Sequence, residues 1–254
     1  HPSVLDLDVD VDDAPGAGRF VSVLRDALLA GTVDVVVHSY KDLPTADVEG
    51  VLVAAVPERA NPCDVLFSPL GGLADLPDGA RVGTSSPRRA AALRRLRPDL
   101  VVVAVPGLQR LGLLDASMAV LDPTLVVPAP AQGALAVECR AYDRLITVVG
   151  QLDDTPTRVA VAAERAVLDG LDASCDIAVG AHASWIGDRV LLLTADLADH
   201  DGIDYARVSR SATVDDAAGA ARLGARVAES LLLLPPTDAD AGAAPDPQAP
   251  QSSV

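Results

Sequence analysis

The feature that most constrains the fold is a short apolar run, Val33–Val37, which is long enough for one strand only and ends directly in polar residues. A nearly all-apolar run of this length is typical of a strand buried on both faces of an α/β sheet. A helical stripe precedes it over Phe20–Ala30, with Gly31 as the expected stop. In open α/β sheets, ligand sites gather beyond the carboxyl ends of strands. The next seven residues, His38–Pro44, are therefore candidate site residues.

A second stretch predicts a strand–helix–strand unit. Arg81–Gly83 has the length of a brief strand, and Leu100–Val105 that of the strand that follows. Between them, Ser86 is placed as an N-cap with Pro87 at the first helical position, so a helix is expected to begin there and to end before Pro98. This order predicts a parallel crossover.

The remaining pattern predicts further strands and helices, with a change of character in the last third of the chain. There the order of elements favours a separate α+β domain, followed by a disordered tail rich in Pro, Ala, Asp and Ser over Pro235–Val254. The expected strands are Val51–Val56, Ala134–Glu138, Val190–Leu197 and Ala206–Val214, and the expected helices are Thr157–Leu171 and Asp215–Leu234.

Composition narrows the class of protein. The chain has 254 residues, of which 50% are hydrophobic but only 2% aromatic, so Val, Leu and Ala must build the cores of two or three domains. No apolar run approaches the ~20 residues of a membrane-spanning helix, and no secretory pattern opens the chain. We therefore expect a soluble cytoplasmic protein without a membrane partner. A net charge of −16 argues against nucleic acid as a partner.

Three cysteines, Cys63, Cys139 and Cys175, have neither the close pairing of a zinc site nor the even number of a disulfide framework. Free thiols in a reducing compartment are expected, and a small buried hydrophobe is the ordinary role. Cys175 differs because it follows a helix and lies in a polar loop. The neighbouring Asp172 and Asp176 disfavour a thiolate, so Cys175 is a weak candidate nucleophile and a plausible point of covalent attachment.

Hydroxyl residues followed by paired arginines predict an anion site over Thr84–Arg89. The free N–H groups of a helix N-terminus and two guanidinium groups favour negative charge. The glycine pattern of a nucleotide P-loop is missing, so carboxylates fit better than a triphosphate. An ordinary capped helix with exposed arginines is the alternative. For the other arginines of this helix, Arg94, Arg95 and Arg97, a solvated basic face and a role in the site are both left open.

Asp42 is the candidate for acid–base chemistry. A carboxylate at a strand end, beside the chain's only lysine, Lys41, could stabilise a developing cation or exchange protons. A turn aspartate that precedes Leu-Pro is the alternative on this stretch alone.

The order of three motifs resembles the hydroxymethylbilane synthase (porphobilinogen deaminase) family. These motifs are His38–Pro44, Thr84–Arg89 and Leu171–Cys175, and the resemblance extends roughly from Gly18 to Leu234. Further stretches match in family order: Gly107–Gly112, Pro128–Ala134, Glu138–Arg140 and Ala163–Ala166.

This resemblance implies an α/β fold of three domains. Residues 1–57 with 131–146, and residues 60–128, would form two lobes like those of periplasmic binding proteins. Residues 148–234 would form an α+β domain that carries the cofactor cysteine, and residues 235–254 a disordered tail. The family also suggests a monomer.

The implied activity is that of a transferase in tetrapyrrole (heme) biosynthesis, which joins four porphobilinogen molecules head to tail and loses ammonia each time. A dipyrromethane cofactor would be thioether-linked to Cys175, no metal would be needed, and Asp42 would be catalytic. The implied cofactor contacts are Ser39, Lys41, Thr84, Ser85, Ser86, Arg88 and Arg89. The implied substrate contacts are Arg88, Arg89, Arg110 and Gln132.

The sequence also departs from the family pattern. It has no Arg-x-Ser turn near its beginning, no Leu-Arg-Gly-Asn stretch between Leu100 and Val101, and Ser174-Cys175-Asp176 where Gly-Cys is commoner. The missing arginines favour an alternative, a non-catalytic relative that binds porphobilinogen or linear tetrapyrroles, whereas Asp42 and Cys175 favour the synthase. A solute-binding protein with the same two lobes is a third reading, in which Cys175 would have no role.

Overall fold

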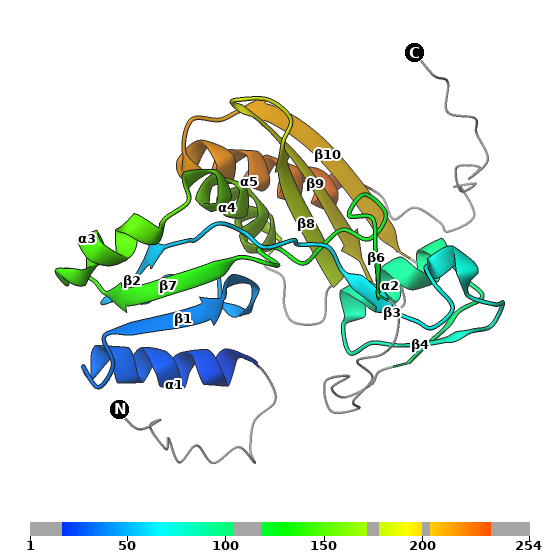
Figure 1. The fold of residues 1–254 in the computed structure, drawn as a ribbon. Coiled ribbons are helices and arrows are strands. Elements are labelled where there is room, and N and C mark those ends of the chain that lie inside the picture. The colour runs from blue at the N-terminus through cyan, green and yellow to red at the C-terminus, as the bar shows by residue number, and fades with distance from the viewer. Residues whose placement is uncertain (1–16, 104–117, 172–177, 200–203, 235–254) are drawn as a thin grey trace.

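The structure is a computed structural model of the whole chain, and it describes residues 17–103, 118–171, 178–199 and 204–234. It is a mixed α/β arrangement in which small sheets and their helices lie around a longer three-stranded sheet (Figure 1). The expectations for Cys175, for Arg110 and for both ends of the chain fall outside the described residues. No helix in the described ranges is long and apolar enough to cross a membrane.

The first sheet has the order β1-β7-β2, with β7 antiparallel to both neighbours. Helix α1 packs on one face of it through Val21, which joins Leu43 and Ala136 in a buried cluster. Gly31 follows α1 with a φ of 73°, a conformation that glycine adopts without strain, and so ends the helix as predicted. The helix and all three strands are confirmed; their bounds are α1 Ala17–Leu29, β1 Val35–Ser39, β2 Val51–Ala55 and β7 Leu135–Arg140.

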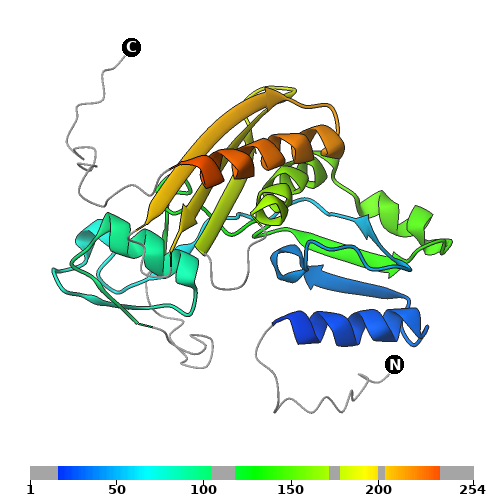
Figure 2. The same cartoon turned by 180° about the vertical axis from the view of Figure 1, so that it is seen from behind.

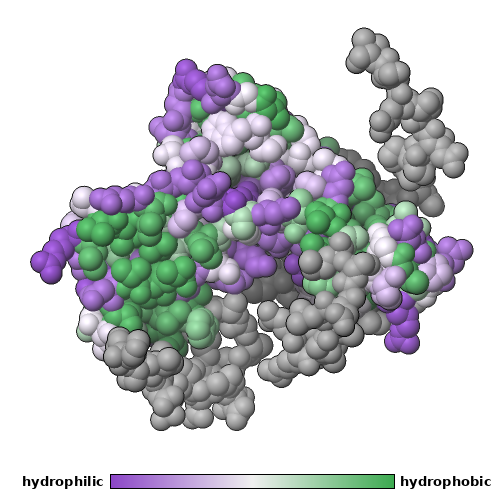
Figure 3. Space-filling view, in the orientation of Figure 1, coloured by the Kyte–Doolittle hydropathy of each residue, from purple (hydrophilic) through white to green (hydrophobic). Residues whose placement is uncertain are grey.

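The expectation that the first strand is buried on both faces is wrong. Exposure alternates along β1, and Val37 is 55% exposed whereas Val36 is buried. The reason is that β1 is an edge strand whose one face is covered by α1. On the opposite face, helix α3 (Leu145–Val149) covers Val137 but leaves Val37 open. Figure 3 shows hydrophobic residues gathered over this lobe.

The middle of the chain forms two small two-stranded sheets and helix α2 (Pro87–Leu96). The predicted parallel pair is confirmed as β4 (Arg81–Gly83) and β5 (Val101–Val103). Ser86 caps α2, with its hydroxyl accepting from the N–H of Arg89 at 3.4 Å. The antiparallel pair β3 (Val65–Phe67) and β6 (Met118–Val120) was not predicted. Three residues on each side are too few to show a period.

Of the two readings of the arginines at the end of α2, a solvated face does not hold for Arg95 and Arg97, which bind other parts of the protein. The Arg95 guanidinium lies 4.3 Å from the ring centroid of Tyr205 and donates to the carbonyl of Leu125. Arg97 pairs with Asp99 and donates to two further carbonyls. These contacts attach α2 to the segment Leu73–Leu76, to the turn at Leu125 and to Tyr205 in the C-terminal part of the chain.

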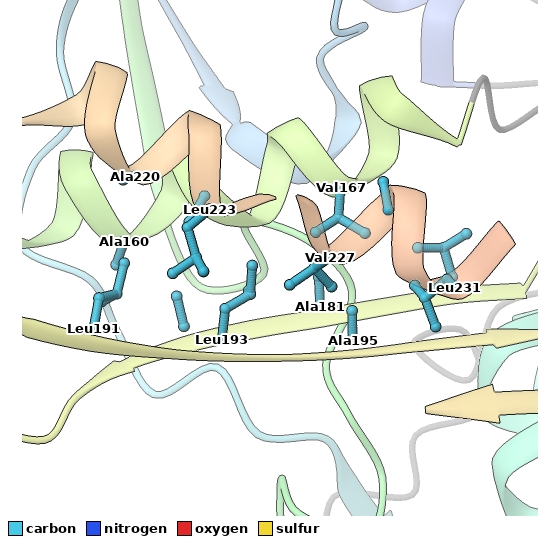
Figure 4. Packing of buried hydrophobic residues seen from close by; sticks show 14 of the residues in the cluster. Ala160, Val167, Ala181, Leu191, Leu193, Ala195, Ala220, Leu223, Val227 and Leu231 are labelled. Carbon is cyan, nitrogen blue, oxygen red and sulfur yellow. The ribbon is translucent and has the colours of Figure 1, made fainter. Parts of the chain in front are cut away.

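The C-terminal part is an antiparallel meander with the order β10-β9-β8 and two helices on one face (Figure 2). The helices α4 and α5 pack against each other and against the sheet, and Figure 4 shows Leu223 and Val227 of α5 directed at the Leu and Ala side chains of the strands. Both helices and two of the strands are confirmed. Their bounds are α4 Thr155–Gly170, β9 Val190–Ala198, β10 Tyr205–Thr213 and α5 Ala217–Leu233.

Strand β8 (Ala178–Trp185) was missed because its side chains are mostly small. Small residues are what the position requires. A Cβ on Gly180 would lie 2.8 Å from the carbonyl oxygen of Val127, and the N–H of Ala181 donates to the carbonyl of Pro128 at 2.9 Å. The backbone of β8 therefore contacts the segment Val127–Pro128, which leads out of the middle part of the molecule.

Gly224 lets α5 approach α4 closely, and Gly224→Ala should destabilise the protein. An added Cβ would lie 2.2 Å from the carbonyl oxygen of Ala163 and 2.7 Å from the Cβ of Ala166, so the helices must move apart. Overpacking of this kind costs about 1–3 kcal/mol. Denaturant titration should show that loss. Gly219→Ala, in the first turn of the same helix, is the control, because its Cβ meets only the ends of side chains at 3.3 and 3.4 Å. An equal stability for the two variants would contradict the packing argument.

Candidate functional site

The first predicted motif forms a short 3-10 turn, Tyr40–Asp42, directly after β1. The N–H of Tyr40 donates to the carbonyl of Ala134 at 3.0 Å, which attaches the turn to the start of β7. Ser39, Lys41 and Asp42 are all exposed. The structure is compatible with both interpretations of Asp42, as a turn residue and as a candidate catalytic carboxylate, because the turn that contains it directly follows a strand.

A buried charge cluster lies beneath this turn. Glu138, 1% exposed, receives a forked pair from Arg25 of α1, with the shortest N–O distance 2.6 Å. Nε2 of His38 lies 3.3 Å from Oε2 of Glu138. Burial lowers the pKa of His38, and Glu138 opposes that shift only in part. The cluster holds the end of β1 against α1 and β7, and so supports the turn from below.

The second predicted motif is built around a residue that sequence reasoning missed. Asp64, 3% exposed, accepts from Nη2 of Arg88 and from Nε of Arg89, each at 2.7 Å. Burial on its own raises the pKa of Asp64, but Arg88, Gln132 and Arg89 outweigh it, so the pKa is lowered. Asp64 therefore stays charged and fixes both arginines. A single acid in a connecting segment gave no pattern by which to find it.

Gln132, which lies 91 residues after Lys41 in the sequence, joins the two motifs. Its amide nitrogen donates to Oδ1 of Asp64 at 2.9 Å, and its amide oxygen lies 3.4 Å from Nζ of Lys41. The network thus runs from Lys41 through Gln132 and Asp64 to the paired arginines. Four of the predicted site residues lie in it: Lys41, Arg88, Arg89 and Gln132.

The arginines differ in what they offer a ligand. Arg88 is buried, and besides Asp64 it donates to the carbonyl of Val127 at 2.5 Å. The Arg89 side chain is 38% exposed. Beside it, Thr84 and Ser86 are half-buried and Ser85 is exposed, and the Thr84 hydroxyl accepts from the N–H of Ser86. An exposed guanidinium, an ammonium group and hydroxyls at a helix N-terminus suit a carboxylate ligand.

A second residue that sequence reasoning did not single out is Glu164 of α4, which is fully buried. It accepts from Arg59 at 2.7 and 3.0 Å, from the N–H of Ala131 at 2.7 Å and from the N–H of Ala183 at 2.8 Å. Burial raises its pKa, but His182, Arg59 and the backbone donor outweigh burial and the pKa is lowered. Glu164 therefore ties α4 and β8 to the two segments that cross between the sheets.

The described residues contain no group of three or more His, Cys, Asp or Glu side chains that could hold a metal ion. Cys139 is buried and Cys63 is half-buried, and both are free thiols as predicted. Burial raises the pKa of each, so neither is an activated nucleophile.

The sequence matches two models of one known protein family. A family model described as porphobilinogen deaminase, dipyromethane cofactor binding domain, matches residues 5–107 and 99–147. A second, described as porphobilinogen deaminase, C-terminal domain, matches residues 158–233. The two matches to the first model meet at the stretch where the sequence departs from the family pattern.

Similar proteins called porphobilinogen deaminase occur in several bacteria. That of Acidothermus cellulolyticus is 45% identical over 89% of this chain and 76% of its own length. That of Thermobifida fusca is 45% identical over 85% of this chain and 77% of its own length. That of Nocardia farcinica is 42% identical over 90% of this chain and 75% of its own length.

Proposed function

Because the chain belongs to the porphobilinogen deaminase family, we propose that it is a hydroxymethylbilane synthase, a transferase that joins four porphobilinogen molecules head to tail. The observation that supports this most is the network from Lys41 to Arg88 and Arg89 through Gln132 and Asp64. The protein as a whole is acidic, but this network brings cationic groups and hydrogen-bond donors together at one place. A substrate with two carboxylates on each pyrrole requires such a group.

The same residues fit the dipyrromethane cofactor for which the N-terminal family model is described. Four carboxylates need several donors that reach solvent, and Lys41, Ser39, Ser85 and Arg89 are partly or fully exposed. When bound, dipyrromethane supplies the pyrrole end from which the chain is extended. We propose Cys175 as its attachment point, Thr84, Ser86 and Arg88 as further contacts, and Arg110 as a substrate contact. Cys175 and Arg110 rest on the sequence motifs alone.

We propose Asp42 as the catalytic carboxylate. Loss of ammonia from porphobilinogen breaks the C–N bond of the aminomethyl group and leaves positive charge that the pyrrole nitrogen shares. A carboxylate beside that nitrogen would stabilise the charge and accept the N–H hydrogen bond. The exposure of Asp42 at the end of β1, above the Arg25–Glu138–His38 cluster, supports this role.

We further infer the three-domain division of the family, with lobes at 1–57 plus 131–146 and at 60–128, and a third domain at 148–234. Separate buried clusters support it: one between α1 and its sheet, one around Leu66 and Leu100, and one between α4, α5 and the meander. A cytoplasmic monomer fits the free thiols and the net charge of −16, which opposes self-association.

A second candidate is a relative that binds porphobilinogen or linear tetrapyrroles without turnover. The observation that favours it is the match to the N-terminal family model, which is split in two near residues 99–107. The sequence departs there from the family pattern and lacks the arginines that the resemblance implies.

Intact-protein mass spectrometry before and after addition of porphobilinogen separates the two candidates. A synthase should carry the added mass of one dipyrromethane on Cys175, and that mass should grow stepwise with substrate. Cys175→Ser should remove the added mass. A mass equal to the bare chain would contradict the proposed synthase and favour the binding protein, and a thioether on Cys63 or Cys139 would overturn the assignment of Cys175.

A further inference from the structure

One arginine of the C-terminal part holds the turn that carries Asp42. Arg165 of α4 donates to three carbonyl oxygens of that segment: to Leu43 at 2.9 Å, to Pro44 at 2.5 Å and to Tyr40 at 3.3 Å. Its guanidinium also lies 4.6 Å from the centroid of the Tyr40 ring. A planar fork of five donors suits this set of carbonyls, and an ammonium group does not reproduce it.

These contacts complete the support of the turn. The N–H of Tyr40 is bound to β7, and the buried side chain of Leu43 packs with Val21 and Ala136. Those two anchors fix the ends of the turn from within the first sheet. Arg165 binds the carbonyls on either side of Asp42 from a different part of the molecule, so the position of the Asp42 carboxylate depends on where α4 lies.

Helix α4 leads into the motif that contains the proposed attachment cysteine. It ends at Gly170, five residues before Cys175. The residue before Arg165 is Glu164, which fixes α4 against one chain crossing by its ion pair with Arg59 and against the other by accepting from the N–H of Ala131. Two neighbouring residues of α4 therefore have linked roles. Glu164 holds the helix against the crossings, and Arg165 holds the segment that carries Asp42 against the helix.

We propose that Arg165 is a positioning residue that sets the place of Asp42 relative to helix α4. This inference rests on the proposed function, because it matters for catalysis only where Asp42 is the catalytic carboxylate. A misplacement of ~1 Å at a reacting centre can cost on the order of 100-fold in rate. The cost falls mainly on kcat because Gln132, Arg88 and Arg89, the other donors of the anion network, lie outside the turn that carries Lys41 and Asp42.

The test compares Arg165→Met and Arg165→Lys with Arg158→Met in the full-length protein. Arg158 is the matched control, since it is a half-buried arginine of the same helix that pairs with Asp153 and donates to the carbonyl of Val53, not to the carbonyls of the turn. Hydrogen–deuterium exchange of the peptide that covers residues 38–46 reports on the turn without any need for turnover. Steady-state kinetics with porphobilinogen give kcat and KM.

We expect Arg165→Met to speed exchange in residues 38–46 and to lower kcat by ~10–100-fold with KM changed less than about twofold. Arg165→Lys should lie between Arg165→Met and the unaltered protein, and Arg158→Met should match the unaltered protein in both readouts.

Exchange in Arg165→Met equal to that in Arg158→Met would overturn the proposed support of the turn. Faster exchange with an unchanged kcat would overturn the positioning role. A failure of the proposed function is distinct, because the unaltered protein would then show no turnover while the exchange effect remained.

Discussion

Asp42→Asn should lower kcat for porphobilinogen consumption by ~10²–10⁴-fold, the range typical of a lost acid–base group. The asparagine keeps the size of the side chain but removes the charge that would stabilise a cationic intermediate. Because Asp42 is exposed at the end of the Tyr40–Asp42 turn, the fold should not change. The measurement is a single-turnover assay on protein already shown by mass spectrometry to carry its cofactor.

A control for this variant is Glu49→Gln, which removes an exposed carboxylate farther along the same connection. It should leave kcat within about twofold and unfold at the same temperature, since surface substitutions seldom matter. A kcat for Asp42→Asn close to that of Glu49→Gln would remove Asp42 from the mechanism. The arginine network would then be a binding site without its catalytic group.

Glu164→Ala should be the most destabilising of these substitutions. It leaves Arg59 buried without its carboxylate and removes the acceptor for the N–H groups of Ala131 and Ala183. Breaking a buried ion pair from one side costs about 3–5 kcal/mol, which is on the order of 10 °C in melting temperature for a chain of this size. Calorimetry on the full chain measures the loss.

The matched control is Glu229→Ala, an exposed carboxylate on α5, which should change stability by less than about 0.5 kcal/mol. Arg59→Met should also be destabilising, because it leaves the buried Glu164 carboxylate without its arginine partner. The interpretation fails if Glu164→Ala melts within a few degrees of Glu229→Ala.

The same carboxylate gives the stability a pH dependence. The pKa of Glu164 is lowered from its usual 4.5 in the folded state, so the unfolded chain binds the proton more readily. Its contribution is therefore fully present above about 4.5 and is lost as the pH falls through the lower, folded pKa. Melting curves between pH 7 and 3 should converge for the unaltered protein and Glu164→Ala.

Sequence reasoning succeeded where a local rule decides structure. Ser86 and Pro87 begin α2, Gly31 ends α1, and the parallel crossover from β4 to β5 follows from element order. It failed where a distant partner decides. Val37 is exposed because of what covers the sheet, and β8 is a strand because small residues admit a neighbouring backbone.

The candidate site shows the same limit. The motifs were found because hydroxyl, basic and acidic residues follow strands, and Lys41, Gln132, Arg88 and Arg89 do lie in one network. Asp64, which fixes the two arginines, is a single acid in a connecting segment. Glu164, which fixes the crossings, lies in the matching stretch Ala163–Ala166, but nothing in that stretch indicates its partners. Their partners lie 18 or more residues away in the chain, and only the fold brings them together.

The position of Glu164 restricts how the two sides of the molecule can move. The chain passes between the first sheet and the middle sheets twice, once near Arg59 and once near Ala131, and both passages bind the same carboxylate. Because both connections are held at Glu164, the two sides can rotate about this residue without breaking its bonds to Arg59 and Ala131. Sliding of one sheet past the other would break these bonds. We therefore expect any widening of the space between Asp42 and the arginines, as the product grows, to take the form of a swing about Glu164.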